Sequence, residues 1–585
     1  MRFPFVLLDT VVGTVCALIL IDNQDTPGST VLNQVVFGAI LGFPLLICLT
    51  FTSEKWKWRR SASLGVQLAA ILFVGLYSTT VPQNLDGIPG IHPIRLLMLT
   101  IGAILLGFSV PFFKRYNELG YWQFCKALCL RVFTTVFSAA VLFGGLAIAL
   151  AALDYLFGVD IPGRRYGELF VLINGTFAIW FFLAGIPKDL DSLNDVTDYP
   201  KELKVFSQFI LIPLVIIYFV ILYGYLGKIL LVWDWPKGWV SRLILGFVAT
   251  GLVSLLLVHP IRDRIENRWM KTVARWFYVA VIPLTIMLFL AVWQRISDYG
   301  ITEGRYLGIA TVIWLCVIAP YFIFSKLKRI LFLPASLCVV VLAVSFGPWG
   351  MFSVSERSQV SRLKQLLVQN HLLVDGQVQS QQDSLPLETN RQISSILGYL
   401  SDVHGFEAIQ PWFRESLLRD SIKNSDIYKD PAQVAKLMSV TYSRVSEASD
   451  DGSITFASDR DSALHIDGYE RMLRRQRIHS GNTNRELSNE GIAYQVGLDL
   501  STISVMVENK TKSIDTLQVE LKPLVDKLIT EYGKASADKI PPEKMVIVAT
   551  SASTMIKIFI SSINVQPHDG KFEVMSFEAD FAYKY

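Results

Sequence analysis

The first 349 residues consist of apolar blocks of about 20 residues, and this repetition constrains the fold more than any other feature. Each block can cross about 30 Å of hydrocarbon as a helix that rises 1.5 Å per residue. Since backbone polar groups without partners cannot face lipid, each block should be an α-helix. Eleven blocks fit this pattern, at 4–21, 31–51, 62–81, 94–113, 128–153, 168–186, 206–231, 239–258, 274–293, 306–324 and 330–346.

Composition changes at the end of these blocks. The whole chain is 52% hydrophobic and 18% charged, whereas soluble chains carry about 25% charged residues. Residues 1–349 have a net charge of +9 and residues 350–585 a net charge of −5. We therefore expect a polytopic α-helical membrane protein with about 11 transmembrane helices in residues 1–349 and a C-terminal soluble α+β domain in residues 350–585.

The C-terminal part mixes two periodicities. Leucine and isoleucine recur at helical spacing in 355–373 and 393–400, and the spacing also predicts helices in 431–445 and 517–532. Alternating apolar residues predict strands that become frequent after residue 453. These predicted strands are 454–456, 493–500, 503–508, 544–549, 555–564 and 571–582.

Lysine and arginine alternate between successive loops of the membrane half. Loops of one parity hold 18 of them near the helix ends and loops of the other parity hold 5. Because cytoplasmic loops carry the excess of basic residues, the N-terminus should be cytoplasmic. With eleven spans, residues 350–585 should then be extracytoplasmic, and an error of one span would reverse that side.

Several other classes of protein find little support. The apolar run that follows Arg2 is long for a signal peptide and has no small-residue cleavage site, so it reads as the first span. The six cysteines lie in or beside apolar blocks, and Cys125 and Cys129 have no further ligands nearby, which favours packing over a metal site. We find no nucleic-acid signature, metal motif or cofactor motif. Ser361 and Lys364 match SxxK without its partner motifs.

Two stretches resemble a known family. The first runs from Trp293 to Tyr306, with the sequence WQRISDYGITEGRY. The second is FGPWG at 346–350, followed by the segment from Ser353 to Ser358 and by Arg362 and Leu363. They are similar to the DUF4153 family of multi-spanning bacterial membrane proteins. The resemblance is good over roughly 200–370 and rests on pattern alone in the first spans. It implies a bacterial cytoplasmic membrane and no particular activity.

The loop that contains the first stretch is the best candidate for a ligand site. Arg295, Tyr299, Thr302, Arg305 and Tyr306 should lie at the outer interface, where two guanidiniums and two phenols could hold a phosphate or a carboxylate. Arginine and tyrosine also serve as interfacial anchors. A third interpretation is that the loop docks the soluble domain.

Ionisable groups inside spans are the usual functional candidates in membrane proteins, and here they are few. Arg131 and Lys228 lie near span ends and should extend to the nearest interface. Asp9 lies about one turn inside the first span, where a hydrogen bond to a neighbouring helix would suffice. Asp22 and Asp25, in the first outward loop, hold the position of acidic residues in enzymes that use lipid-linked sugars.

Histidines and arginines of the C-terminal part show no catalytic spacing. Arg471, Arg474, Arg475 and Arg477 form a basic run with His479 that could meet anionic headgroups or an envelope polymer, and a solvated face is the simpler interpretation.

Three classes of function follow. The absence of catalytic motifs favours a non-enzymatic protein of the bacterial cell envelope that senses or scaffolds, with the lipid bilayer and an envelope polymer or protein as partners. Eleven spans exceed what an anchor needs, which favours a small-molecule or lipid transporter. An enzyme acting on a lipid-linked substrate is the third class.

Overall fold

The structure is a computed structural model of the whole chain. It describes residues 2–22, 29–81, 90–196, 199–232, 239–262, 268–325, 329–379, 385–417, 430–440, 442, 454–459, 464–469, 471–479, 485–489, 492–499, 502–508, 514–533, 537–550, 555–568 and 571–584. Two compact units meet in the chain at Gln359 and Val360. That division lies inside a helix, α14 (Met351–Gln369), ten residues beyond the change in composition at 349/350.

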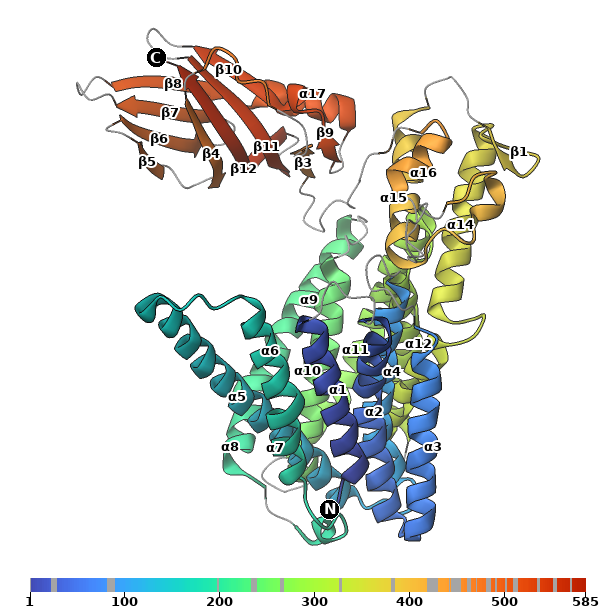
Figure 1. Cartoon of the computed structure of the whole chain (residues 1–585). Helices are drawn as coiled ribbons and strands as arrows, with labels where there is room; N and C mark the ends of the chain where they lie inside the picture. The colour runs from blue at the N-terminus through green and yellow to red at the C-terminus, as the bar shows by residue number, and fades with distance from the viewer. Residues whose placement is uncertain are drawn as a thin grey trace. The chain divides into compact units, whose positions relative to one another are not determined.

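The first unit is helical (Figure 1). Its helices are α1 Pro4–Asp22, α2 Ser29–Lys55, α3 Arg60–Ser78, α4 Ile91–Ser109, α5 Glu118–Phe157, α6 Arg164–Leu172, α7 Ile179–Ala184, α8 Lys201–Phe206, α9 Ile212–Val232, α10 Trp239–Val258, α11 Arg268–Tyr299, α12 Glu303–Phe324 and α13 Phe332–Ser345.

These helices match the apolar blocks. Ten helices in the described part of the chain are long and apolar enough to cross a membrane. Large apolar side chains lie exposed along them, for example Phe133 at 70% and Ile148 at 72% on α5, as expected of surfaces that contact lipid rather than water. The structure therefore confirms a polytopic helical protein. The predicted eleventh span corresponds to α13, which has 14 residues and falls short of the length of the other ten.

The main helix contacts form an open row. From one end it runs through α9, α10, α11, α12, α13, α4, α2, α1 and α6, and α5 packs beside α6 and α7. The row is bridged where α5 begins: Trp122 of α5 donates from Nε1 to the carbonyl oxygen of Leu256 in α10, the neighbour of α9, at 2.8 Å. Toward its C-terminus α5 leans away from α6 (Figure 1).

Two spans contain π-helical segments, at Ile173–Ala178 and Ser207–Leu211. The second precedes Pro213, which lies at the start of α9. Proline has no N–H and clashes with the carbonyl of the preceding turn, so a widened turn before it relieves the clash. Pro44, Pro283 and Pro320 lie inside α2, α11 and α12, as the sequence predicts.

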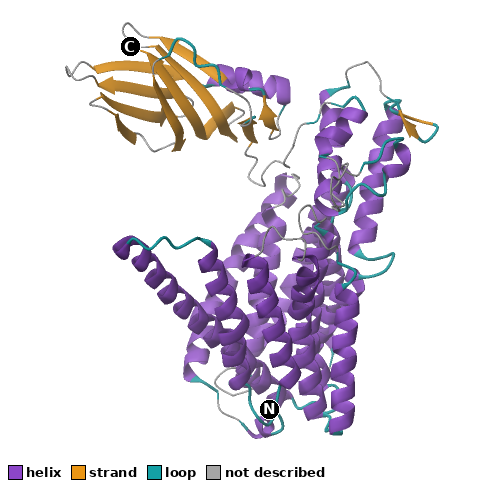
Figure 2. Ribbon diagram, viewed as in Figure 1, coloured by secondary structure: helices purple, strands orange, loops and turns teal. Residues whose placement is uncertain are grey.

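The second unit contains helices and strands (Figure 2). Its elements after α14 are β1 Leu373–Val374, β2 Gln377–Val378, α15 Leu387–Val403, α16 Pro431–Leu437, β3 Ile454–Ser458, β4 Arg471–His479, β5 Arg485–Asn489, β6 Ile492–Asp499, β7 Thr502–Glu508, β8 Ile514–Glu520, α17 Lys522–Tyr532, β9 Ala537–Ile540, β10 Val546–Thr550, β11 Met555–His568 and β12 Lys571–Lys584. The α+β prediction for this part is confirmed.

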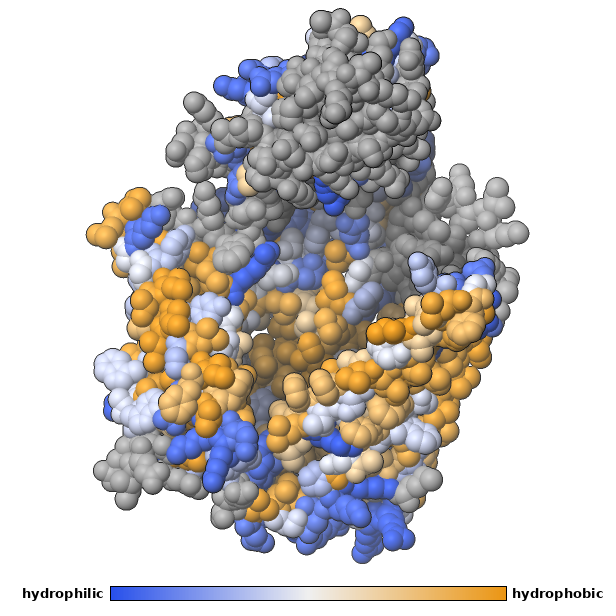
Figure 3. All heavy atoms as spheres, turned by 90° about the vertical axis from the view of Figure 1, so that its left-hand side faces the viewer, coloured by the Kyte–Doolittle hydropathy of each residue, from blue (hydrophilic) through white to orange (hydrophobic). Residues whose placement is uncertain are grey.

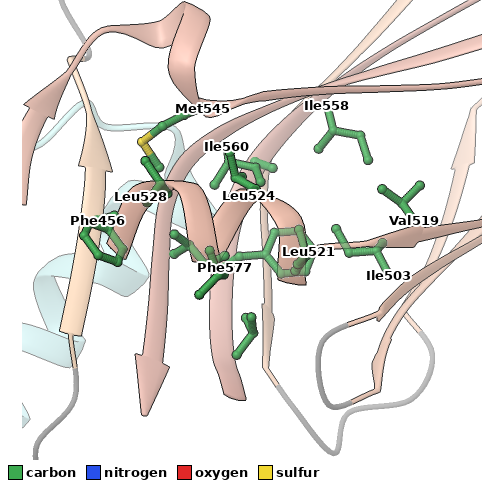
Figure 4. Packing of buried hydrophobic residues seen from close by; sticks show 14 of the residues in the cluster. Phe456, Ile503, Val519, Leu521, Leu524, Leu528, Met545, Ile558, Ile560 and Phe577 are labelled. Carbon is green, nitrogen blue, oxygen red and sulfur yellow. The ribbon is translucent and has the colours of Figure 1, made fainter. Parts of the chain in front are cut away.

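The strands form two larger sheets. One has the order β4-β12-β11-β3-β9 with β10 also paired to β11, and the other has the order β5-β6-β7-β8. Every pairing is antiparallel except β3 with β9. Leu524 and Leu528 of α17 pack into a core with Phe456 and Phe577, and Ile503 from the second sheet joins the same core (Figure 4).

Two sequence predictions for this part need correction. Residues 517–520 are strand rather than helix, because Leu517 and Val519 alternate toward the core and helical spacing begins only after Leu521. The helix predicted at 431–445 ends at Leu437, and Ser439 follows with a left-handed φ of 57°. The predictions at 441 and 443–445 lie outside the described residues.

Candidate functional site

The loop between α11 and α12 is a tight reversal. It begins after Tyr299, and Gly300 takes a left-handed φ of 75° that glycine adopts without strain. Thr302 is extended and precedes the first turn of α12. The loop thus brings the end of one span directly to the start of the next, and its backbone polar groups need partners outside the two helices.

Helix α14 supplies those partners. Gln359 Nε2 donates to the carbonyl oxygens of Tyr299 and Ile301, both at 3.0 Å. The Ile301 N–H donates to Ser358 Oγ at 3.0 Å. Gln359 is only 3% exposed, so these hydrogen bonds lie inside the packed structure. The middle of α14 is therefore fastened to the loop. We refer to Tyr299, Gly300, Ile301, Ser358 and Gln359 as the loop lock.

The predicted site residues Arg305 and Tyr306 take part in the same connection. Arg305 Nη1 donates to the carbonyl oxygens of Tyr299 at 3.2 Å and Gly300 at 2.9 Å. Its guanidinium also lies 5.4 Å from the centre of the Tyr299 ring. Tyr306 donates its hydroxyl to the carbonyl oxygen of Trp349 at 2.6 Å.

The structure therefore brings Tyr299, Arg305 and Tyr306 together, with Thr302 between them in the chain. Arg295 lies on α11 one turn before Tyr299 and has interactions of its own. Arg305 binds carbonyl oxygens of its own loop, and Tyr306 binds the carbonyl oxygen of Trp349. These contacts connect parts of the chain to one another and do not form an open anion site. Ligand binding by these five residues stays a prediction. Gln359 and Ser358 were not predicted, since nothing in the sequence links residue 300 to residue 359.

Arg131 finds partners on α7. It donates from Nη2 to the carbonyl oxygen of Phe181 and from Nε to that of Phe182 at 3.3 Å. The guanidinium also lies 4.0 Å from the centre of the Phe181 ring. These carbonyls belong to the last turn of α7, where the helix dipole favours a cation. Arg131 thus joins α5 to the end of α7.

Asp9 lies against a different helix, α2. A Cβ atom added to Gly42 would lie 2.7 Å from Asp9 Oδ1, so the glycine makes room for the carboxyl group. Asp9 Oδ2 is buried and has no hydrogen-bond partner among the described residues. The hydrogen bond that the sequence favours for Asp9 is therefore not present at this oxygen.

A cavity of about 540 Å³ lies where α1 ends and α6 begins. Its apolar wall consists of Leu18 of α1, Leu150 of α5, and Leu169 and Leu172 of α6, with Ile161 and Pro162 from the α5–α6 connection. Its polar residues are Asp160, Arg165 and Glu168. We call this cavity the α5–α6 groove. Figure 3 shows the side of the first unit toward which α5 leans in Figure 1, and the mainly apolar surface of that side is hollowed.

Ion pairs surround the groove. Arg165 Nη1 lies 2.7 Å from Glu168 Oε2, and Arg164 Nη1 lies 3.7 Å from Asp22 Oδ1. Asp22 therefore pairs with α6, while Asp25 lies outside the described residues. This place was not predicted from the sequence. The available signal was the Arg164–Arg165 pair in a loop of the parity that is otherwise poor in basic residues.

The remaining candidates have ordinary surroundings. In the described residues no group of three or more His, Cys, Asp or Glu side chains could hold a metal. Ser361 and Lys364 are both exposed on α14. Arg477 of the basic run pairs with Glu578 at 3.1 Å across neighbouring strands. His404 Nε2 lies 3.0 Å from the Tyr399 hydroxyl.

Comparison with known proteins gives a family. The model of the family described as "Domain of unknown function (DUF4153)" matches residues 10–386. The chain is also 23% identical over 495 residues to "Uncharacterized protein PM1469" of Pasteurella multocida (strain Pm70), which covers 76% of this chain and 79% of that one. No solved structure matches. The match extends beyond the two stretches at 293–306 and 346–350 to most of the membrane half, and the chain belongs to the DUF4153 family.

Proposed function

We propose that the protein is a non-enzymatic protein of the bacterial cytoplasmic membrane, whose C-terminal α+β domain lies outside the cytoplasm and senses or scaffolds. The membrane helices anchor this domain and relay its state. An envelope polymer or another envelope protein is the proposed partner. The side of the membrane on which the C-terminal domain lies depends on whether the short helix α13 spans the membrane.

The contacts of α13 with α12 carry this proposal. At the start of α13, Phe332 stacks on Tyr321 with ring centres 4.0 Å apart, and Tyr321 lies near the end of α12. After α13, the Trp349 carbonyl accepts from Tyr306, which lies near the start of α12. The chain from 329 to 349 therefore runs antiparallel to α12 along its length. This supports an eleventh crossing, which the 14 helical residues alone do not supply.

The loop lock supports the relay. Helix α14 contributes Ser358 and Gln359 to the loop lock, while Leu363 and Leu367 of the same helix belong to the core of the second unit with Ile393. Because a helix transmits displacement better than a flexible linker, a change in that core would reach the ends of α11 and α12.

Cysteine accessibility tests the proposal. The six native cysteines are replaced, and single cysteines are introduced at Lys527 of α17 and at Ser61 of α3, both exposed. Intact cells are then labelled with a membrane-impermeant maleimide. We expect labelling at 527 and none at 61, with both sites labelled after lysis. Labelling at neither site before lysis, which ten spans would give, or labelling at 61 alone would place the C-terminal domain in the cytoplasm and overturn the proposal.

A transporter of a small molecule or lipid is the second candidate, and the α5–α6 groove favours it. The acidic residue expected for the lipid-linked-sugar enzyme, Asp22, pairs with Arg164. No observation favours the enzyme over the other two classes.

A further inference from the structure

The α5–α6 groove combines an apolar wall with a charged rim. Four leucines, Leu18, Leu150, Leu169 and Leu172, come from three helices. The groove has a volume of about 540 Å³ and is largely open to its surroundings. A cavity with apolar walls in a membrane protein is accessible to acyl chains, which surround the protein at high concentration.

The charged rim lies at the ends of the spans. Asp22 is the last residue of α1, Gly158 caps α5, and Arg164 is the first residue of α6. The ends of spanning helices lie in the headgroup layer of the bilayer. The rim therefore faces lipid headgroups, while the leucines of the groove lie at the level of the chains.

The charges of the rim select among headgroups. Arg165 contacts both oxygens of Glu168 through Nη1 alone, at 2.9 and 2.7 Å. Its remaining N–H groups have no hydrogen-bond partner within the described residues, and a guanidinium binds phosphate oxygens well. Arg164 pairs with Asp22. Asp160 is exposed and makes neither a hydrogen bond nor an ion pair with any residue that the structure describes.

We propose that the α5–α6 groove binds a zwitterionic aminophospholipid of the phosphatidylethanolamine class. One acyl chain packs against Leu150 and Leu169, the phosphate accepts hydrogen bonds from Arg165, and the ammonium group pairs with Asp160. The rim carries three carboxylates and two guanidiniums, so its net charge of −1 disfavours an anionic headgroup such as phosphatidylglycerol. This site is independent of the role proposed for the C-terminal domain.

Native mass spectrometry of the purified full chain tests the site. The protein is reconstituted with equal amounts of phosphatidylethanolamine and phosphatidylglycerol that have the same acyl chains, and the lipids retained after release are counted. We expect the unmodified protein to retain phosphatidylethanolamine about tenfold over phosphatidylglycerol, as one favourable ion pair near the interface would give.

Matched variants separate the headgroup from the chain. Asp160→Asn should bring the ratio of the two lipids to about one, and Asp160→Glu should restore the preference. Asp154→Asn removes a carboxylate from α5 at a residue that does not line the groove, and it should leave the ratio unchanged. Leu150→Trp fills the groove and should reduce retention of both lipids, whereas Leu146→Trp, one turn earlier, should not. Equal retention by the unmodified protein, or the same preference in Asp160→Asn and Asp154→Asn, would overturn the proposal.

Discussion

Two connections between spans, both predicted to face outward, each have two arginines in or beside them, and the side-chain contacts of these arginines differ. In the α11–α12 loop, Arg305 donates to two carbonyl oxygens of the loop itself. In the α5–α6 connection, Arg165 meets one carboxylate through a single nitrogen and borders a cavity. The sequence favours the first loop as a ligand site. The two pairs of arginines therefore look alike in sequence and differ in the partners of their guanidinium N–H groups.

The largest expected effect on stability concerns Lys55, a buried cation. The Lys55 side chain is 1% exposed, and its Nζ lies 2.7 Å from Asp191 Oδ1 and 3.3 Å from the Leu190 carbonyl. Asp191→Asn would leave this ammonium buried without its counter-charge, at a cost of about 3 kcal/mol. Lys55→Met should cost less, because Asp191 is 40% exposed and can return to water. Thermal unfolding in detergent measures the stability of both variants. An equal loss of stability in the two would contradict this expectation.

The same pair should give a pH dependence. The hydrogen bond from Lys55 lowers the pKa of Asp191, and the charges of Lys55, Lys57 and Arg115 lower it further. Its stabilisation is therefore complete above the unfolded pKa of about 3.9 and is lost as the pH falls through the lower folded value. The gap in Tm between the unmodified protein and Asp191→Asn should narrow below about pH 4. A gap that is constant from pH 6 to about pH 3 would exclude this origin.

The loop lock predicts the next largest effect. Gln359→Leu removes the donor of two carbonyl oxygens in a part-buried place, and leaving such groups without partners costs about 2 kcal/mol. Gln365→Leu, on the exposed face of the same helix, should change stability by less than about 0.5 kcal/mol. Hydrogen exchange of the 299–302 segment should rise in the first variant only. Unchanged exchange there would mean that the loop does not depend on α14.

A glycine pair sharpens the comparison further. Gly300 has a φ of 75°, and an added Cβ would lie 2.9 Å from Gln359 Nε2, so Gly300→Ala should destabilise by about 1–2 kcal/mol. Gly304 lies in the first turn of α12 with open space around it, so Gly304→Ala should be neutral or stabilise by up to about 1 kcal/mol. Chemical denaturation should show changes in the free energy of unfolding of opposite sign for the two variants. A loss at 304 as large as that at 300 would argue against the left-handed conformation of Gly300.

The smallest effect on stability is expected at the groove. Arg165→Gln should leave the free energy of unfolding almost unchanged, because exposed ion pairs contribute little. Arg305→Gln should cost about 1 kcal/mol, since it removes charged hydrogen bonds to two carbonyls. A larger loss at Arg165 than at Arg305, measured by the same unfolding assay, would reverse the comparison between the two loops.

The spans could be predicted from the sequence because lipid selects on composition. The predicted block 306–324 became α12 (Glu303–Phe324), and 4–21 became α1. Hydropathy says nothing of polar partners distant in the chain, so the hydrogen bonds between Gln359 and Tyr299 could not be foreseen. The groove was missed for the same reason, because it needs three helices to meet.

In the C-terminal domain the failures are local. Residues 471–479 were interpreted as a basic run, yet they form strand β4. In the strand order of its sheet β4 is the outermost strand beside β12, and edge strands tolerate charged residues that protect the edge. Ile478, which is 3% exposed, lies on the buried face of this strand. Strand β8 (Ile514–Glu520) passes almost directly into helix α17 (Lys522–Tyr532). A stretch of sequence that spans both elements mixes the two-residue period of the strand with the 3.6-residue period of the helix.

The length of α5 has a consequence for the whole membrane half. Its 40 residues extend about 60 Å, roughly twice the hydrocarbon thickness of a typical bilayer. A helix that long fits by tilting or by projecting from the membrane, so the thickness of the surrounding bilayer influences how far α5 leans. The base of α5 is tied to α10 through Trp122, whereas Leu150 lies 28 residues further along the helix. A change in the tilt of α5 would therefore displace Leu150 more than Trp122 and alter the spacing between α5 and α6.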